Sequence, residues 1–342
     1  MYAPNRTRSP LDPALHRSPP RPGALLVLAG ALGLAPGRAP ATAADSSTAA
    51  PRQATPAQSA CSVYGPARLV TRVTHPQLVE SSGIVASRRH AGVFYTHNDS
   101  GNLPLLFAVR EDGTVPAVFR LQGAKNEDWE DISLGPAPSG DGSALYLGDV
   151  GSSRPEPARL TIYVLPEPEL PAAPPAEPIV VPAASFHLTY PEDPQDCEAL
   201  AVHPVTGVLY LMTKPLSARP PLLYRCAPPF AAGATRALEP VGPVSLANDP
   251  LVTGMDIHPG GARLIVRTYF RAYEFVAATP VLFEERIAFP ARPVSIVPMG
   301  QSEAICYGAG GTSLFVTAEG SPMPLYEVPC AALTQRERRK LR

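Results

Sequence analysis

The sequence predicts a five-bladed β-propeller, because one strand–turn–strand pattern recurs five times along the chain. Each copy is a short apolar run, a turn containing Gly or Pro, and a second apolar run rich in Val, Leu, Tyr and Phe. Roughly 50–70 residues separate successive copies, a spacing typical of propeller blades. The 44 Pro and 26 Gly of the 342-residue chain also argue against a helical fold. The copies begin at Ser82, Glu130, Glu198, Thr253 and Glu303.

Each copy supplies the two inner strands of a blade, and the residues that follow it supply the outer strands. Residues 166–182 are rich in Pro, Glu and Ala, so we expect them to lie outside the sheets. The long interval between the second and third copies leaves a six-bladed propeller as the alternative, which this Pro-rich composition disfavours. The outermost strands of the first four blades are expected at residues 115–121, 185–190, 237–244 and 283–289.

The last copy is followed by one further strand, so its blade lacks an outer strand. Residues 61–74 form an apolar segment before the first copy, and we expect this N-terminal strand to complete the last blade. Such closure removes the exposed strand edges of an open ring. It also brings Cys61 close to Cys330 and predicts a disulfide between them. We expect the remaining cysteines to be buried thiols: Cys197, Cys226 and Cys306. A bridge between Cys197 and Cys226 is the alternative.

The N-terminus has the pattern of a secretory signal peptide. Several Arg residues precede an apolar stretch at 23–36, and Ala41-Thr42-Ala43 offers a cleavage site. This pattern predicts a signal peptide at residues 1–43. A membrane anchor is the alternative, although the apolar stretch is short for a bilayer span. We therefore expect a secreted or extracytoplasmic protein whose mature chain has no transmembrane span.

The rest of the chain divides by composition into a flexible linker at 44–60, the propeller domain at 61–332 and a basic tail at 333–342. The signal peptide carries five Arg and one Asp, so its removal changes the net charge from −1 to −5. A mildly acidic domain argues against a nucleic-acid partner. We expect a monomer that binds a small-molecule or cell-envelope ligand.

Chemistry-bearing side chains are expected at one mouth of the central channel. The first position of each copy faces this mouth and places three carboxylates and two hydroxyls there: Glu130, Glu198, Glu303, Ser82 and Thr253. The second strand of each copy ends at the same face, and the connection before the second copy also reaches it. These segments add His97, Asn98, Asp99, Asp128, Asp149, Lys214, Arg267 and Glu319.

Carboxylates held this close repel each other by several kcal/mol at an effective dielectric constant of about 20. A bound Ca²⁺ or Mg²⁺ would offset the repulsion, and its predicted ligands are Glu130, Glu198 and Glu303. Pairing with Lys214 and Arg267 is a second remedy. A raised pKa on one Glu is a third, and that residue would be a candidate general acid. A purely structural role, in which the acids accept backbone N–H bonds, is the alternative.

Three strings carry a resemblance to known proteins: His97-Asn-Asp-Ser-Gly101, Asp128-Trp-Glu-Asp-Ile132 and Gly148-Asp-Val-Gly151. Through them, residues from about 78 to 330 resemble a family of secreted bacterial β-propeller proteins, mostly of unassigned function. More distantly, the repeat is similar to propellers of the gluconolactonase/SMP-30 and NHL types. Gluconolactonase-type enzymes hydrolyse lactones with a divalent metal in the channel mouth. The acids of this chain follow a different spacing, so the resemblance implies the fold and not the reaction.

Two functions of different classes follow from these residues. The first is a secreted module that binds a small molecule, glycan or envelope component at an acidic, divalent-metal-binding mouth. The second is a metal-dependent hydrolase of lactones, esters or phosphoesters. The sequence holds no nucleophile beside a base and no common catalytic motif, which favours the binding module.

Overall fold

The computed structural model describes residues 61, 63–152, 159–217, 219–276, 283–287, 289–297 and 301–331. All of these belong to one compact unit, Thr55–Arg342. The predicted signal peptide, linker and basic tail lie outside the described residues. Within the described ranges, no helix has the length and apolarity needed to cross a membrane.

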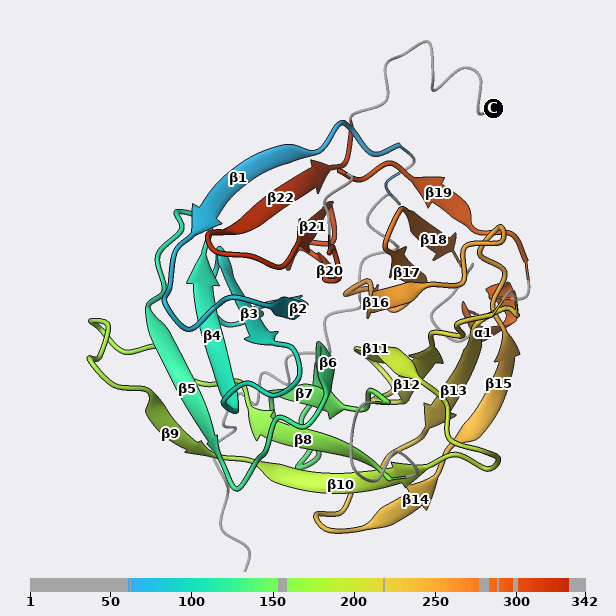
Figure 1. Ribbon diagram of the computed structural model, residues 1–342, viewed down its shortest axis with the longest axis horizontal. Helices are drawn as coiled ribbons and strands as arrows, with labels where there is room; N and C mark the ends of the chain where they lie inside the picture. The colour runs from blue at the N-terminus through green and yellow to red at the C-terminus, as the bar shows by residue number, and fades with distance from the viewer. Residues whose placement is uncertain are drawn as a thin grey trace, which may run out of the picture. The chain divides into compact units, whose positions relative to one another are not determined.

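Five β-sheets form the blades of a propeller, which confirms the predicted fold class (Figure 1). Blade one contains β2 (Ser81–Ala86), β3 (Val93–Asn98), β4 (Leu105–Arg110) and β5 (Ala117–Gln122). Blade two contains β6 (Trp129–Pro136), β7 (Ser143–Asp149), β8 (Leu160–Pro166) and β10 (Ala184–Thr189). Blade three contains β11 (Cys197–Val202), β12 (Leu209–Thr213), β13 (Leu222–Cys226) and β15 (Glu239–Pro243).

The last two blades complete the ring. Blade four contains β16 (Val252–Ile257), β17 (Arg263–Thr268), β18 (Ala272–Val276) and β19 (Arg292–Val294). Blade five contains β20 (Ile305–Tyr307), β21 (Ser313–Thr317), β22 (Met323–Pro329) and, as its outer strand, β1 (Arg68–Val73). The five innermost strands, one from each blade, surround the centre of the ring (Figure 1).

The N-terminal strand closes the ring as predicted. β1 runs antiparallel to β22, with Arg68 opposite Glu327 and Val73 opposite Met323. Cys61 and Cys330 form the predicted disulfide, and their Cα atoms are 5.5 Å apart. The bond links positions 269 residues apart and therefore joins the two ends of the propeller.

Two predictions at the blade edges were wrong. Residues 166–182 do not lie wholly outside the sheets, because β9 (Ile179–Pro182) adds in parallel to the edge of blade one beside β5. Residues 283–289 are not the outer strand of blade four, since α1 (Phe283–Arg286) lies there and β19 takes that place. The outer strand of blade three, predicted at 237–244, is confirmed as β15, and β14 (Thr235–Ala237) is an additional strand that pairs in parallel with β10 of blade two. Exposed edges accept whichever extended segment reaches them, so sequence spacing does not assign them.

The free cysteines and the single Trp occupy the core. Cys197, Cys226 and Cys306 are buried and unbridged, so the alternative bridge between the first two is wrong and the prediction of buried thiols is confirmed. Trp129 is fully buried and its indole N–H donates to the carbonyl of Lys125 at 2.8 Å. These side chains are therefore part of the packing between neighbouring blades.

Asp131 lies on the innermost strand of blade two, and its side chain is fully buried. The equivalent position is Gly or Ala in the other four blades, as the copies of the repeat show. The Asp131 carboxylate accepts backbone N–H bonds from Ile132 at 2.8 Å, Leu200 at 2.9 Å and Met255 at 3.1 Å. A Cβ added at Gly83 would lie 2.9 Å from the Asp131 Cα, so only glycine fits there. Blades two, three and four are thus tied together beneath the channel mouth.

Candidate functional site

The two hydroxyls of the predicted ring serve the neighbouring blades. Ser82 donates to the carbonyl of Glu130 at 2.7 Å, and Thr253 donates to the carbonyl of Glu303 at 3.0 Å. Both side chains are buried. Each hydroxyl therefore fixes the backbone of the acidic residue on the next blade and leaves that residue's carboxylate to face other groups.

Asp99 lies at the centre of the acidic side chains. A carboxylate oxygen of Asp99 lies within 4.8 Å of oxygens from Asp128 and Glu130. A carboxylate oxygen of Asp99 also lies within 4.8 Å of oxygens from Glu303 and Glu319. Asp99 follows β3 of blade one, and Glu319 follows β21 of blade five. The structure thus divides the acids into two groups that share Asp99, a division that the repeat positions do not predict.

The buried glutamate Glu303 has an oxygen without a hydrogen-bond partner. Only 5% of this residue is exposed, and among the described residues no group bonds its Oε2. Burial, followed by the charges of Asp99 and Glu319, raises the pKa of Glu303 to about 8. A bare carboxylate in this position is unfavourable and calls for a proton or a cation.

Arg267 does not pair with this carboxylate directly. Its guanidinium donates to the carbonyls of Ser302 at 3.1 Å and Ala304 at 3.2 Å, and also to the hydroxyl of Ser302. Burial lowers the pKa of Arg267 to about 9, and the charge of Glu303 opposes that shift. Arg267 therefore holds the backbone on both sides of Glu303, and its charge acts on the carboxylate only at longer range.

Glu198 and Lys214 form an ion pair at the mouth. Lys214 Nζ lies 2.9 Å from Glu198 Oε1 and 3.3 Å from the hydroxyl of Tyr269. Burial raises the pKa of Glu198 to about 6, although the charge of Lys214 opposes the shift. Burial, then the charge of Glu198, raises the pKa of Glu130 well above its ordinary value. Burial therefore favours the protonated form of Glu130, while Lys214 favours the charged form of its neighbour Glu198.

The other predicted site residues position the mouth. Asp149 accepts the backbone N–H of Asp128 at 2.9 Å. Asn98 accepts the N–H groups of Val79 and Glu80, each at 3.0 Å.

His97 is fully buried, and its Nδ1 lies 3.0 Å from the carbonyl of Asn98. Its ring contacts Trp129 edge-on at 5.8 Å between centroids. Burial lowers the pKa of His97 to about 4, so the ring is neutral at physiological pH. His97 and Asn98 thus support the backbone that leads to Asp99.

Two residues at the mouth were missed by the sequence analysis. Tyr269 bonds Lys214, and it directly follows the second strand of blade four, a position from which the sequence could have predicted it at the mouth. Asn126 donates to the carbonyls of Asn98 at 3.0 Å and Asp99 at 2.7 Å. Asn126 gave no such signal, because its contact is to backbone on another blade.

Comparison with known proteins finds no family model and no curated protein that matches this chain. Among solved structures, it is similar to a gluconolactonase from Xanthomonas campestris, with 18% identity, a TM-score of 0.43, and coverage of 78% of this chain and 98% of that one. It is also similar to a glutaminyl cyclase from Myxococcus xanthus, with 14% identity, a TM-score of 0.42, and coverage of 78% and 100%. At these similarities, neither protein's activity is transferred to this chain.

Proposed function

We propose that this chain is a secreted binding protein that holds a Ca²⁺ or Mg²⁺ ion at the channel mouth. The unpartnered Oε2 of Glu303 carries this proposal, because it is a buried carboxyl oxygen beside two other carboxylates, where a bound cation would replace the proton that burial favours. The ligands are Asp99, Glu303 and Glu319, which all offer the oxygen atoms that these hard cations prefer. A small polar molecule or an envelope component would bind over the cation at the open mouth.

The neighbouring cations support a site at this group of acids. Lys214 is hydrogen-bonded to Glu198 and Tyr269, and Arg267 is hydrogen-bonded to the backbone around Glu303. Neither places a guanidinium or ammonium hydrogen on the Glu303 oxygen. The positive charge that this group requires is therefore supplied best from outside the chain.

The proposed ligands revise the three glutamates expected from the sequence. Glu303 is retained. Glu198 is set aside, because the charge of Lys214 already neutralises it at 2.9 Å. Glu130 is set aside because it belongs to the second group around Asp99, with Asp128, and not to the group that contains the unpartnered oxygen of Glu303.

Thermal melting of the disulfide-bonded protein tests this proposal. EDTA should lower the melting temperature, and added Ca²⁺ or Mg²⁺ should restore it by mass action. Glu303→Gln keeps the side-chain shape and should abolish the response to the cation. Glu239→Gln, at a side chain 55% exposed on blade three, is the matched control and should respond as the wild type does. Melting that is indifferent to EDTA and to both cations would exclude the site.

A hydrolase of lactones, esters or phosphoesters is the second candidate. The raised pKa of Glu130 beside Glu198, whose charged form Lys214 stabilises, favours it, because such a pair can deliver a proton to a leaving oxygen and take one from water. A divalent cation at the mouth would supply Lewis-acid polarisation of a substrate oxygen. Screening an ester, lactone and phosphoester panel, with Glu130→Gln as the inactive control, tests this function. A turnover unchanged by Glu130→Gln would exclude Glu130 as the acid.

A further inference from the structure

A cavity of about 400 Å³ opens beside the connection from blade three to blade four. Two segments line it: residues 219–221, between β12 and β13, and residues 244–250, between β15 and β16. Lys214 of the channel mouth directly follows β12, so these segments lie at the same end of the propeller as the mouth. None of the proposed cation ligands lines this cavity, so it is a separate site.

The deepest residues of the cavity are apolar. Pro221, Val244 and Leu246 are buried, and the last two belong to the core that blades three and four share. The N–H of Val244 donates to the carbonyl of Pro221 at 2.9 Å, which fixes the two segments against each other. Pro220 and Pro250 add apolar surface, and we call the site the proline-lined cavity. Such a surface accommodates the apolar part of a ligand.

A guanidinium without a counter-charge lies at the edge of the proline-lined cavity. Arg219 is exposed and lines the cavity, and among the described residues no group forms an ion pair or hydrogen bond with its guanidinium. Arg219 also lines a smaller cavity that contains Glu192 and Asp193, but neither acid lies within ion-pair distance of it. A guanidinium can donate two parallel hydrogen bonds to a carboxylate, so this edge suits a carboxylate ligand.

The turn at residues 246–249 adds backbone donors to the cavity. Ala247 and Asn248 have φ angles of 49° and 64°, and no other non-glycine residue in the described ranges has a positive φ. The N–H of Asp249 donates to the carbonyl of Leu246 at 3.0 Å and closes the turn. The N–H groups of Ala247 and Asn248 have no acceptor among the described residues. Successive N–H groups of a turn form a concavity that binds anions, and strained backbone of this kind is typical of ligand sites.

The acid that lines the cavity is engaged by blade four. Asp249 Oδ2 accepts hydrogen bonds from the hydroxyls of Thr268 at 2.6 Å and Tyr273 at 3.2 Å. These two donors belong to β17 and β18. The carboxylate of Asp249 is therefore held toward that sheet, and it forms no ion pair with Arg219.

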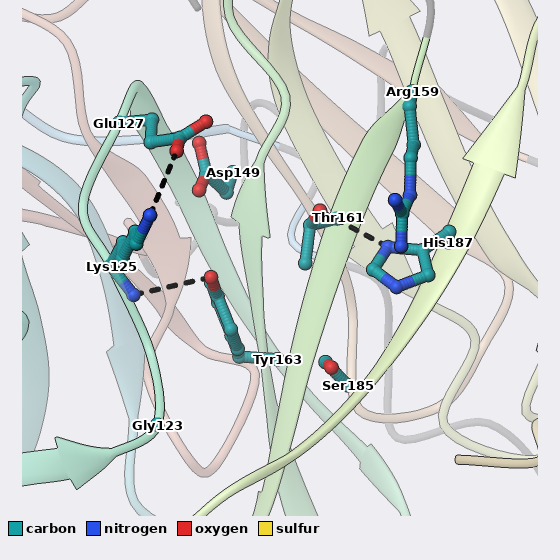
Figure 2. Close-up of a pocket in the computed structure, with 9 residues that line it drawn as sticks. All are labelled: Gly123, Lys125, Glu127, Asp149, Arg159, Thr161, Tyr163, Ser185 and His187. Carbon is teal, nitrogen blue, oxygen red and sulfur yellow. Dashed lines mark hydrogen bonds and ion pairs between the residues drawn. The ribbon is translucent and has the colours of Figure 1, made fainter. Parts of the chain in front are cut away.

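Another cavity, of about 380 Å³ on blade two, differs because its charged groups already have partners (Figure 2). Lys125 Nζ lies 4.0 Å from a carboxylate oxygen of Glu127. Asp149 accepts the backbone N–H of Asp128 at 2.9 Å. Of the two cavities, the proline-lined cavity is therefore the one that offers an unmatched charge beside an apolar surface.

We propose that the proline-lined cavity binds a small apolar carboxylate, such as an aryl or alkyl carboxylic acid. The carboxylate would face Arg219 and the N–H groups of Ala247 and Asn248, and the apolar group would pack on Val244 and Leu246. A cationic ligand would be repelled by the guanidinium, and an uncharged apolar ligand would leave it unmatched. A peptide fits less well, because the prolines that line the cavity have no N–H to donate to a peptide backbone.

Titration calorimetry on the full disulfide-bonded chain in EDTA tests this proposal apart from the cation site. The probes are phenylacetate and hexanoate, compared with phenylacetamide, which lacks the charge, and acetate, which lacks the apolar group. At least one of the two acids should bind, and the amide and acetate should bind about tenfold more weakly or worse. Equal binding of phenylacetamide, or no binding of either acid at millimolar concentration, would overturn the proposal. Much tighter binding of N-acetyl-prolyl-phenylalanine would replace the small acid by the C-terminus of a peptide.

Two variants locate the site. Arg219→Gln should weaken phenylacetate binding about tenfold and leave the melting temperature unchanged, because the guanidinium is exposed and unpaired. Ser245→Trp, at an exposed residue of the lining, should fill the cavity and abolish binding. Arg120→Gln, at an exposed position of β5 on blade one, is the control and should bind as the wild type does. Wild-type affinity in both Arg219→Gln and Ser245→Trp would show that the acid binds elsewhere and that this assignment is wrong.

Discussion

Lys214 Nζ lies 2.9 Å from Glu198 Oε1, and only about a tenth of either side chain is exposed. The pair divides the acidic mouth into two parts. On one side the charge of Glu198 is balanced within the protein. On the other, Glu303 keeps a buried oxygen that no described residue bonds. Lys214 therefore balances Glu198 directly but does not bond the buried oxygen of Glu303.

Replacing Glu198 should separate structural acids from cation ligands. Glu198→Gln leaves the Lys214 ammonium without its anionic partner, and we expect a loss of about 2–4 kcal/mol in the free energy of unfolding. The rise in melting temperature caused by Ca²⁺ should keep its wild-type size. Denaturant unfolding with and without Ca²⁺ measures both quantities. If the melting temperature of Glu198→Gln no longer responds to Ca²⁺, Glu198 is a ligand of the cation.

The raised pKa of Glu303 predicts a pH dependence of stability. Its pKa rises from 4.5 to about 8 on folding, so between these values the folded chain binds more protons than the unfolded chain. The free energy of unfolding therefore falls as pH rises across this window. Glu198, at about 6, and Asp256, at about 7, are also raised by burial and act in the same direction.

Melting temperatures measured in EDTA should accordingly fall between about pH 5 and pH 8. Saturating Ca²⁺ should reduce the fall, because the cation binds the ionised carboxylates. Glu303→Gln should also reduce it, without any cation. A melting temperature that rises with pH in EDTA would contradict this account of the mouth.

The disulfide between Cys61 and Cys330 should stabilise the whole ring. It closes a loop that spans 269 positions, and its loss should lower the free energy of unfolding by about 2–5 kcal/mol. Cys61→Ser and treatment of the wild type with a reductant should have similar effects on thermal melting. Non-reducing peptide mass spectrometry should recover the Cys61–Cys330 peptide. Free thiols at both positions after oxidative expression would remove the claim.

The buried carboxylate of Glu274, next to this disulfide, should contribute nearly as much to the free energy of unfolding. Glu274 is almost fully buried and accepts hydrogen bonds from Tyr64 at 2.8 Å and Tyr307 at 2.9 Å. It also forms ion pairs with Arg263, at 3.3 Å, and with Arg292. Arg292 in turn donates to the carbonyl of Cys61 at 2.9 Å. Glu274 therefore ties blade four to the N-terminal segment and to blade five.

Glu274→Gln should cost about 3–5 kcal/mol, because the buried guanidinium of Arg263 loses its counter-charge. Glu239→Gln, which removes an exposed partner of Arg225, should change stability by less than about 1 kcal/mol. Urea unfolding of the two variants measures the difference. Similar stabilities for both would show that the Glu274 network contributes little to closure.

Much of this protein follows from its sequence. The recurring strand–turn–strand pattern determined the blades, since apolar periodicity reports which strands are buried. The count of strands determined that residues 61–74 close the last blade, and this closure placed Cys61 beside Cys330. Repeat alignment also predicted that the acids share one mouth, because equivalent positions of successive blades face the same end of a ring.

The tertiary structure alone determined the edges of the blades and the partners of the acids. β9 and β14 join neighbouring sheets in parallel, and their short sequences carry no alternation that specifies this pairing. The grouping around Asp99, and the pairing of Glu198 with Lys214, depend on separations of a few ångströms between blades. Electrostatic energy and hydrogen bonding change steeply over such distances. Sequence spacing fixes which residues share a mouth, but the packing of the blades decides which of their atoms meet.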